Sequence, residues 1–139
     1  MSRYRYTISL RLEHPSADPA DFTSALGLKP SRSWRVGEPR STAKGKPMKG
    51  NYAESFWTAT LVEDQWSEKA LADAISEVLD QLAAHRGFFH QLRSERGKAE
   101  FYVGWFFHGR GGGDVFSCGL LARLADLKID LSLDVYPPA

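Results

Sequence analysis

The stretch Leu26–Gly37, with the sequence LGLKPSRSWRVG, is the point around which the chain is organised. Gly27 is placed to end a helix in a left-handed turn, and Pro30 prevents that helix from resuming. A short strand is then expected over 33–36, in which Trp34 stands between two arginines. The stretch therefore predicts a change from helix to strand in the first quarter of the chain.

Apolar and polar residues alternate without interruption over 4–12, which is the period of a strand with one buried face. Asp18 and Pro19 then form a pair typical of a helix start, because the carboxylate can cap free N–H groups and proline fits the first helical position. The next patterns predict a strand over 55–62 and a long helix that starts at Ser67 and ends at Gly87, with Trp66 packed on Leu71. A helical turn at 88–92 and a strand over 99–108 are expected to follow. The last predicted elements are a helix capped by Ser117 and a strand over 130–136.

The predicted order is β-α-β-β-α-β-α-β. A strand–helix–strand unit within one sheet forms a right-handed crossover, so all helices can lie on one face of a mixed five-stranded sheet. We expect an α+β fold, a two-layer sandwich of ferredoxin-like character, in one domain over 1–139. Leu124–Lys128 repeats the helix end at Ala25–Lys29, and Asp126 is expected to adopt the left-handed conformation of Gly27.

The bulk composition is that of a globular domain, with 42% hydrophobic and 25% charged residues among 139. The single cysteine, Cys118, excludes an internal disulfide and suits a reducing compartment. The first residues carry charges with no apolar run behind them, unlike a signal peptide, and no stretch approaches the length of a membrane span. We therefore expect a cytoplasmic protein that does not associate with membranes.

Charge is concentrated in one segment. Between Lys29 and Lys49 the chain has seven basic residues and one acidic residue, so this segment carries +6 while the whole chain carries only +1. Such a basic patch attracts anionic partners. Proline and glycine punctuate the region 38–54, for which we predict a mobile basic loop without regular structure.

Trp34 shares its predicted strand face with Val36, which favours a place in the core, as for Trp57 and Trp105. Its arginine neighbours favour a different role, because a partly exposed tryptophan beside arginines has the composition of a binding hot spot. The candidate partner-binding residues are Arg32, Trp34, Arg35, Arg40, Lys44, Lys46 and Lys49.

The outer face of the predicted sheet combines arginines, aromatics and acids. Aromatics on an open sheet can stack bases in RNA-recognition folds, but this chain has no ribonucleoprotein motif. Cross-strand Arg–Asp pairs, with the aromatics making a dimer or partner surface, are the simpler interpretation, and nucleic acid is disfavoured. The residues expected on this face are Arg5, Arg11, Tyr102, Phe106, Ser132, Asp134 and Tyr136. Those expected in the core include Cys118, Leu120, Leu121, Leu124, Leu131, Leu133 and Val135.

No catalytic signature is present. The glycine-rich loop 109–114 lacks the Gly-Lys-Ser/Thr ending of a phosphate-binding loop, so a flexible connector is favoured. His108 and Arg110 are the weak candidates for anion binding or acid–base chemistry. The four histidines follow no metal-ligand spacing and one cysteine cannot build a thiolate zinc site, so we assign no metal, no cofactor and no catalytic residue.

The order of these motifs resembles the uncharacterised bacterial domain-of-unknown-function family 4279. The resemblance rests on the Leu-Gly-Leu-Lys-Pro run with Trp34 and Gly37, on Trp57 in the next strand, and on the leucine-rich helix and acidic strand at 120–136. It covers nearly the whole chain and transfers no catalytic residue. It implies a small single-domain bacterial protein, a profile shared by many toxin-neutralising immunity proteins.

These observations favour a non-catalytic protein-binding module. Its most concrete form is an immunity-type protein whose partner is a toxin. The alternatives are a single-stranded nucleic-acid-binding domain that uses the basic segment, and a small enzyme that uses His108 and Arg110. A homodimer through the open sheet face is a further hypothesis.

Overall fold

Strand β1 (Tyr4–His14) lies in the centre of a five-stranded sheet with the order β2-β5-β1-β6-β7. The computed structural model describes residues 4–107 and 112–136. Strand β1 pairs antiparallel with β5 (Ser55–Ser67) on one side and with β6 (Lys98–Phe106) on the other. β2 (Arg32–Trp34) pairs antiparallel with β5, and β7 (Ile129–Tyr136) pairs parallel with β6. The sheet is mixed, as predicted.

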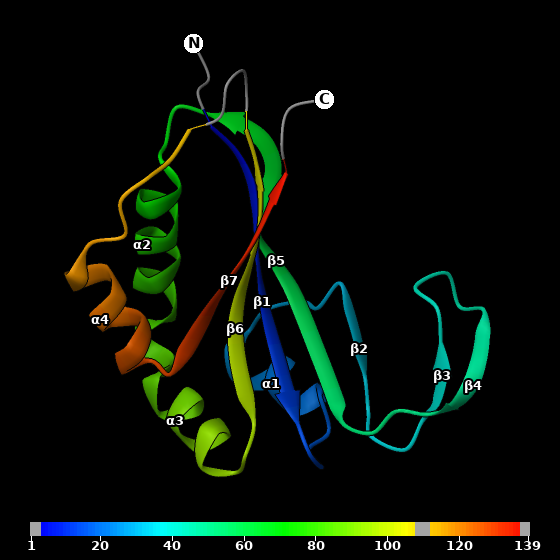
Figure 1. Cartoon of the computed structure of the whole chain (residues 1–139). Coiled ribbons are helices and arrows are strands. Elements are labelled where there is room, and N and C mark those ends of the chain that lie inside the picture. Colours follow the sequence, from blue (N-terminus) through cyan, green and yellow to red (C-terminus); the bar gives the residue numbers. More distant parts are fainter. Residues whose placement is uncertain (1–3, 108–111, 137–139) are drawn as a thin grey trace.

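The helices all lie on one face of this sheet, so the fold is the expected two-layer α+β sandwich (Figure 1). They are α1 (Ala20–Leu26), α2 (Leu71–Leu82), the 3₁₀ helix η1 (Ala83–His85), α3 (Arg86–Ser94) and α4 (Cys118–Asp126). Helix α1 ends at Gly27, whose φ of 67° is the predicted left-handed cap. Ser117 caps α4 as predicted, with its side chain accepting from the Leu120 N–H.

The core fills the space between the sheet and the helices. Every second residue of β1, from Tyr6 to Leu12, is at most 2% exposed. Trp57 of β5 and Trp105 of β6 are buried on the same face, which confirms their predicted place. The Trp57 indole N–H donates to Thr23 Oγ1 at 3.0 Å, so its polar atom is satisfied by α1.

Ser55 is a fully buried hydroxyl that joins three segments of the chain. Its Oγ donates to the Ala17 carbonyl at 2.6 Å and accepts from the Val36 N–H at 3.0 Å. The first of these partners precedes α1 and the second follows β2. This one hydroxyl therefore fixes the start of β5 to the segment before α1 and to the segment after β2.

Helix α2 begins four residues later than predicted. Ser67 is the last residue of β5 and not a cap, and the expected contact between Trp66 and Leu71 is wrong, since Trp66 lies in the strand opposite Arg5 and is 43% exposed. The reason is a register shift between Tyr6 and Ile8, beyond which β5 continues to pair with β1.

The first turn of α2 is capped from a distant part of the chain. Ala70 precedes the helix and offers no side-chain cap, but Asp114 Oδ2 accepts from the Ala72 N–H at 2.8 Å. The same carboxylate accepts from the Val115 N–H through Oδ1 at 2.7 Å. At the other end, Gly87 does not end the helical region as predicted, because it lies inside α3.

Three further expectations are corrected near the C-terminus. Asp126 stays in α4, and the left-handed residue is Lys128, with a φ of 60°. Cys118 and Leu121 are exposed, because α4 turns only part of its surface towards the core. Leu131, Leu133 and Val135 lie on the helix-covered side of the sheet as predicted, but Leu133 and Val135 are 37% and 52% exposed.

The region 38–54 contains regular structure where none was expected. Strands β3 (Pro39–Ser41) and β4 (Pro47–Asn51) form a separate antiparallel pair. The turn between them contains Gly45 with a φ of 85°, and the Lys46 N–H donates to Thr42 Oγ1 at 3.0 Å. This hairpin projects away from the sheet beside β2 (Figure 1).

Replacement of Ser55 by alanine should destabilise the fold by about 1–3 kcal/mol, because the Val36 N–H and the Ala17 carbonyl lose their buried partner. Urea unfolding followed by circular dichroism measures this change. Ser33→Ala, at an exposed position of β2, is the control and should shift stability by less than about 0.5 kcal/mol. Equal effects of the two variants would contradict the role given to Ser55.

Candidate binding surface

The face of the sheet opposite the helices is open, and no helix of the described residues lies on it (Figure 1). We call it the outer face. The strand registers place the predicted set there, since Arg5 pairs with Phe106 and Arg11 lies next to Tyr102 on adjacent strands. The residues confirmed on the outer face are Arg5, Arg11, Tyr102, Phe106, Ser132, Asp134 and Tyr136.

Arginines of the outer face cover its aromatic rings. The Arg5 guanidinium carbon lies 4.3 Å from the centre of the Phe106 ring, and that of Arg11 lies 3.8 Å from the centre of the Tyr102 ring. Both distances are within the range of a cation–π interaction. A guanidinium therefore occupies one face of each of these two rings.

The same arginines are paired with acids. Arg5 forms a bidentate pair with Asp64, at 2.7 and 2.8 Å, and the guanidinium holds the pKa of that carboxyl below its usual value. Arg11 Nη1 lies 3.8 Å from Glu100 Oε1. The ladder of opposite charges that the sequence predicted exists, but its acids come from β5 and β6. The centre of the outer face is thus nearly neutral.

Tyr102 and Asp134 join β6 to the edge strand β7. The Tyr102 hydroxyl donates to Asp134 Oδ2, and this hydrogen bond to the carboxylate raises the pKa of the Tyr102 phenol. Beside them, Phe106 and Tyr136 stack with ring centres 4.8 Å apart. These contacts couple adjacent strands through side chains as well as through the backbone.

Trp34 lies on the outer face, so its predicted place in the core is wrong. It stands opposite Phe56 in the β2–β5 register, on the side of the sheet that the core residues do not share. Its ring is sandwiched between Tyr52 at 4.1 Å and Phe56 at 4.5 Å. We call Trp34, Tyr52 and Phe56 the aromatic stack. The Trp34 indole N–H donates to the Glu54 carbonyl at 3.1 Å.

The hairpin formed by β3 and β4 is anchored to the aromatic stack. Tyr52 exchanges two hydrogen bonds with the backbone of Ser41, and Arg32 Nη2 donates to the Ser41 carbonyl at 2.9 Å. The Arg32 guanidinium carbon also lies 4.8 Å from the Trp34 ring centre. Arg32 and the aromatic stack therefore fix the base of this hairpin on the sheet.

Four of the predicted partner-binding residues lie in this hairpin, which we call the basic hairpin. All four side chains are exposed: Arg40, Lys44, Lys46 and Lys49. Arg40 Nη1 donates to the Lys49 carbonyl at 3.3 Å and thereby links the two strands. The hairpin is a cationic arm beside the aromatic stack.

Arg35 does not belong to this surface. Trp34 and Arg32 lie on the outer face, and Arg35 Nη1 lies 3.5 Å from Asp18 Oδ2, next to helix α1. The alternation of a strand sends adjacent residues to opposite faces, so the sequence neighbours Trp34 and Arg35 are separated. The predicted set thus divides into a group on the outer face and one residue outside it.

The remaining candidates offer little chemistry. His108 and Arg110 lie outside the described residues. His14 is buried, with Nδ1 accepting from two backbone N–H groups and Nε2 2.9 Å from Glu95 Oε1, which is a structural role. Within 4–107 and 112–136, no three His, Cys, Asp or Glu side chains are grouped so that they could hold a metal ion.

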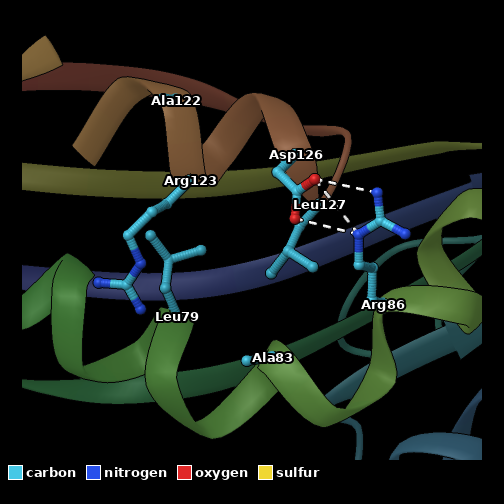
Figure 2. Close-up of a pocket in the computed structure, with 7 residues that line it drawn as sticks. All are labelled: Leu79, Ala83, Arg86, Ala122, Arg123, Asp126 and Leu127. Atoms are coloured by element: carbon cyan, nitrogen blue, oxygen red, sulfur yellow. Dashed lines mark hydrogen bonds and ion pairs between the residues drawn. The ribbon is translucent and has the colours of Figure 1, made fainter. Parts of the chain in front are cut away.

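A shallow groove of about 440 Å³ lies between α2 and α4. Figure 2 shows Leu127 beside Arg86, which forms a bidentate pair with Asp126, and Leu79 beside Arg123. Arg123, at the other end, is paired with Asp80 and Ser76. Both cations are therefore engaged, and the residues that line this groove include no serine, threonine, cysteine or histidine.

One comparison with known proteins is positive. The family model described as "Domain of unknown function (DUF4279)" matches residues 4–138. The chain belongs to this family. No curated protein and no solved structure matches it. The DUF4279 match confirms the resemblance carried by the Leu-Gly-Leu-Lys-Pro run and Trp34. Within the ranges that the structure describes, none of the helices of this DUF4279 chain is both long and apolar enough to cross a membrane.

The Tyr102 phenol should ionise later than an ordinary tyrosine, whose pKa is about 10. Because the folded pKa is raised, its contribution to stability is complete below about pH 10 and is lost as the pH rises towards the folded pKa. Absorbance at 295 nm during an alkaline titration measures the tyrosinate formed. Tyr102→Phe should remove a late step from this titration.

Asp134→Asn is the matched control, because it removes the carboxylate and keeps the phenol. It should move the late step back towards pH 10. A difference between the wild type and Tyr102→Phe that is centred near pH 10 would contradict the coupling of Tyr102 to Asp134.

Proposed function

We propose that the protein is a non-catalytic protein-binding module that presents the aromatic stack and the basic hairpin to an acidic surface of a partner protein. The observation that carries this proposal is that the hairpin with four exposed cations is anchored through Ser41 to Tyr52 and Arg32, which pack on Trp34. Tryptophan, tyrosine and arginine are the residue types enriched in binding hot spots. Cations around such a centre steer an acidic partner and increase the rate of encounter.

The packing of the aromatic stack supports a protein partner over a single-stranded nucleic acid. Nucleic-acid platforms offer a free ring face on which each base can stack. Here Tyr52 and Phe56 occupy the two faces of Trp34, and Arg11 covers Tyr102. The rings are held rigidly, so little side-chain entropy is lost when a partner covers their edges.

The charge of the outer face supports the same choice. Arg5 and Arg11 are balanced by Asp64 and Glu100, so a phosphate backbone laid across the strands would meet as many acids as bases. Four further cations lie away from these pairs on the basic hairpin, which projects from one edge of the sheet. A partner with a local acidic patch fits this distribution better than a long polyanion.

In its finer form, the proposal places the protein in the bacterial cytoplasm as an immunity-type protein that neutralises a toxin. One support for this form is the analogy with immunity proteins, many of which are small and consist of one domain. The other is charge, because a basic hairpin fits an acidic patch on a toxin. The competing enzyme hypothesis depends on His108 and Arg110, which lie outside the described residues.

The test uses the product of each gene adjacent to that of this protein, expressed together with it and measured by isothermal calorimetry. Lys44→Glu with Lys46→Glu should weaken the complex at least tenfold, and Trp34→Ala should do the same by removing the centre of the aromatic stack. Arg96→Glu with Lys128→Glu is the control, since it reverses two exposed charges that lie in turns outside the outer face.

Two results would overturn the proposal. One is a complex that the control weakens as much as the hairpin variant does. The other is tight binding of a fluorescent oligo-uridine or oligo-thymidine strand that falls steeply with salt and is abolished by Lys44→Glu with Lys46→Glu. The second result would establish the nucleic-acid alternative.

A further inference from the structure

The two edges of the sheet are built differently. Strand β2 forms one edge with only three residues, Arg32–Trp34. Strand β7 forms the other edge with eight residues, Ile129–Tyr136, without a proline or a bulge (Figure 1). Within the described ranges, β7 pairs only with β6. A long regular edge strand is a template for pairing with another chain.

The backbone of β7 directs alternate residues towards this open edge. The Tyr136 carbonyl accepts from the Phe107 N–H at 3.1 Å, so the backbone groups of even-numbered residues point to β6. The N–H and C=O groups of the odd-numbered residues, Leu131, Leu133 and Val135, therefore point to the open edge. These three residues could form a new ladder without any loss of pairing to β6.

The side chains of the same residues are apolar and incompletely covered. Leu133 and Val135 are 37% and 52% exposed on the side of the sheet that carries the helices. At the start of β7, Ile129 is buried together with Leu124 of α4, whereas Leu133 further along the strand is exposed. Apolar side chains and free backbone groups thus coincide at one edge.

We propose that a second copy of this chain occupies the edge, with the two β7 strands antiparallel and Leu133 on the two-fold axis. In this register Leu133 faces Leu133 of the second copy, and Leu131 faces Val135. Each of these pairs aligns the outward-pointing backbone groups, so each exchanges two hydrogen bonds. On the outer face, Asp134 stands opposite Ser132, and Asp130 stands opposite Tyr136.

Charge selects this register over its neighbours. A shift that places Ser132 on the axis sets Asp130 opposite Asp134, and a shift that places Asp134 on the axis sets that residue opposite its own copy. Like charges directly opposite each other on adjacent strands are destabilising. The register centred on Leu133 is the one that pairs the apolar residues over most of the strand and separates the aspartates.

This dimer would be independent of the partner surface proposed above. It joins the two sheets into one, with the outer faces side by side and each basic hairpin at the far edge beside β2. It differs from a face-to-face dimer, which would cover the outer face. The proposal can therefore fail while the proposed function stands, and the reverse also holds.

Site-specific oxidation tests the register. In a Cys118→Ser background, Leu133→Cys should form a disulfide-linked dimer under a mild oxidant, because residues that face each other across such a ladder have Cα atoms about 5.5 Å apart. Val135→Cys is the control. Its two copies would be four residues apart along the strands, about 13 Å, and should not crosslink.

Sedimentation equilibrium of the uncrosslinked protein provides the second measurement. The wild type should dimerise, and Leu133→Pro should raise the dissociation constant at least tenfold, since proline removes an outward-pointing N–H and leaves the bonds to β6 in place. Leu133→Lys should act in the same direction by placing two like charges on the axis. Circular dichroism confirms that each variant is folded.

A wild-type protein that remains monomeric at high concentration, with no crosslinking of Leu133→Cys, would overturn the proposal. So would a dimer in which Val135→Cys crosslinks as readily as Leu133→Cys, or one that survives both Leu133→Pro and Leu133→Lys. Crosslinking at Leu133→Cys alone, with dimer loss in the other two variants, establishes the β7 interface.

Discussion

The double pairing of β1 is the constraint on which the rest of the structure depends. This strand is hydrogen-bonded to β5 and β6 along its length, and its even-numbered side chains from Tyr6 to His14 are buried. Because alternate residues of a strand point to opposite faces, the helices that cover one face bury these side chains together. The other face must then be stable in water, which it achieves through Arg5 over Phe106, Arg11 over Tyr102 and the acids that hold both arginines.

The outer face differs between its centre and its margin beside β2. At its centre, Arg5 and Arg11 are paired with acids, and each guanidinium lies over an aromatic ring. Next to β2, the aromatic stack lies on the outer face. The basic hairpin projects away from the sheet at this margin (Figure 1). This contrast between a neutral centre and a cationic margin is the reason why we propose a protein with a local acidic patch as the partner, and not a long polyanion.

Local signals in the sequence identified most elements but not the contacts that join them. The alternation of β1 and the glycine after α1 were sufficient, because each depends on residues next to it in the chain. The start of α2 was misplaced, since β5 continues past a register shift that only its pairing with β1 reveals. Trp34 was misplaced because its main partner, Tyr52, arrives from the far side of a hairpin that the sequence did not predict.

The cap that Asp114 provides has a consequence for the order of folding. Ala70 gives α2 no side-chain cap, and the carboxylate that replaces one lies 42 residues further along the chain. During synthesis, this cap cannot form until Asp114 has left the ribosome and has docked on the first turn of α2. The N-terminus of α2 is therefore completed by a segment that is synthesised well after the helix itself.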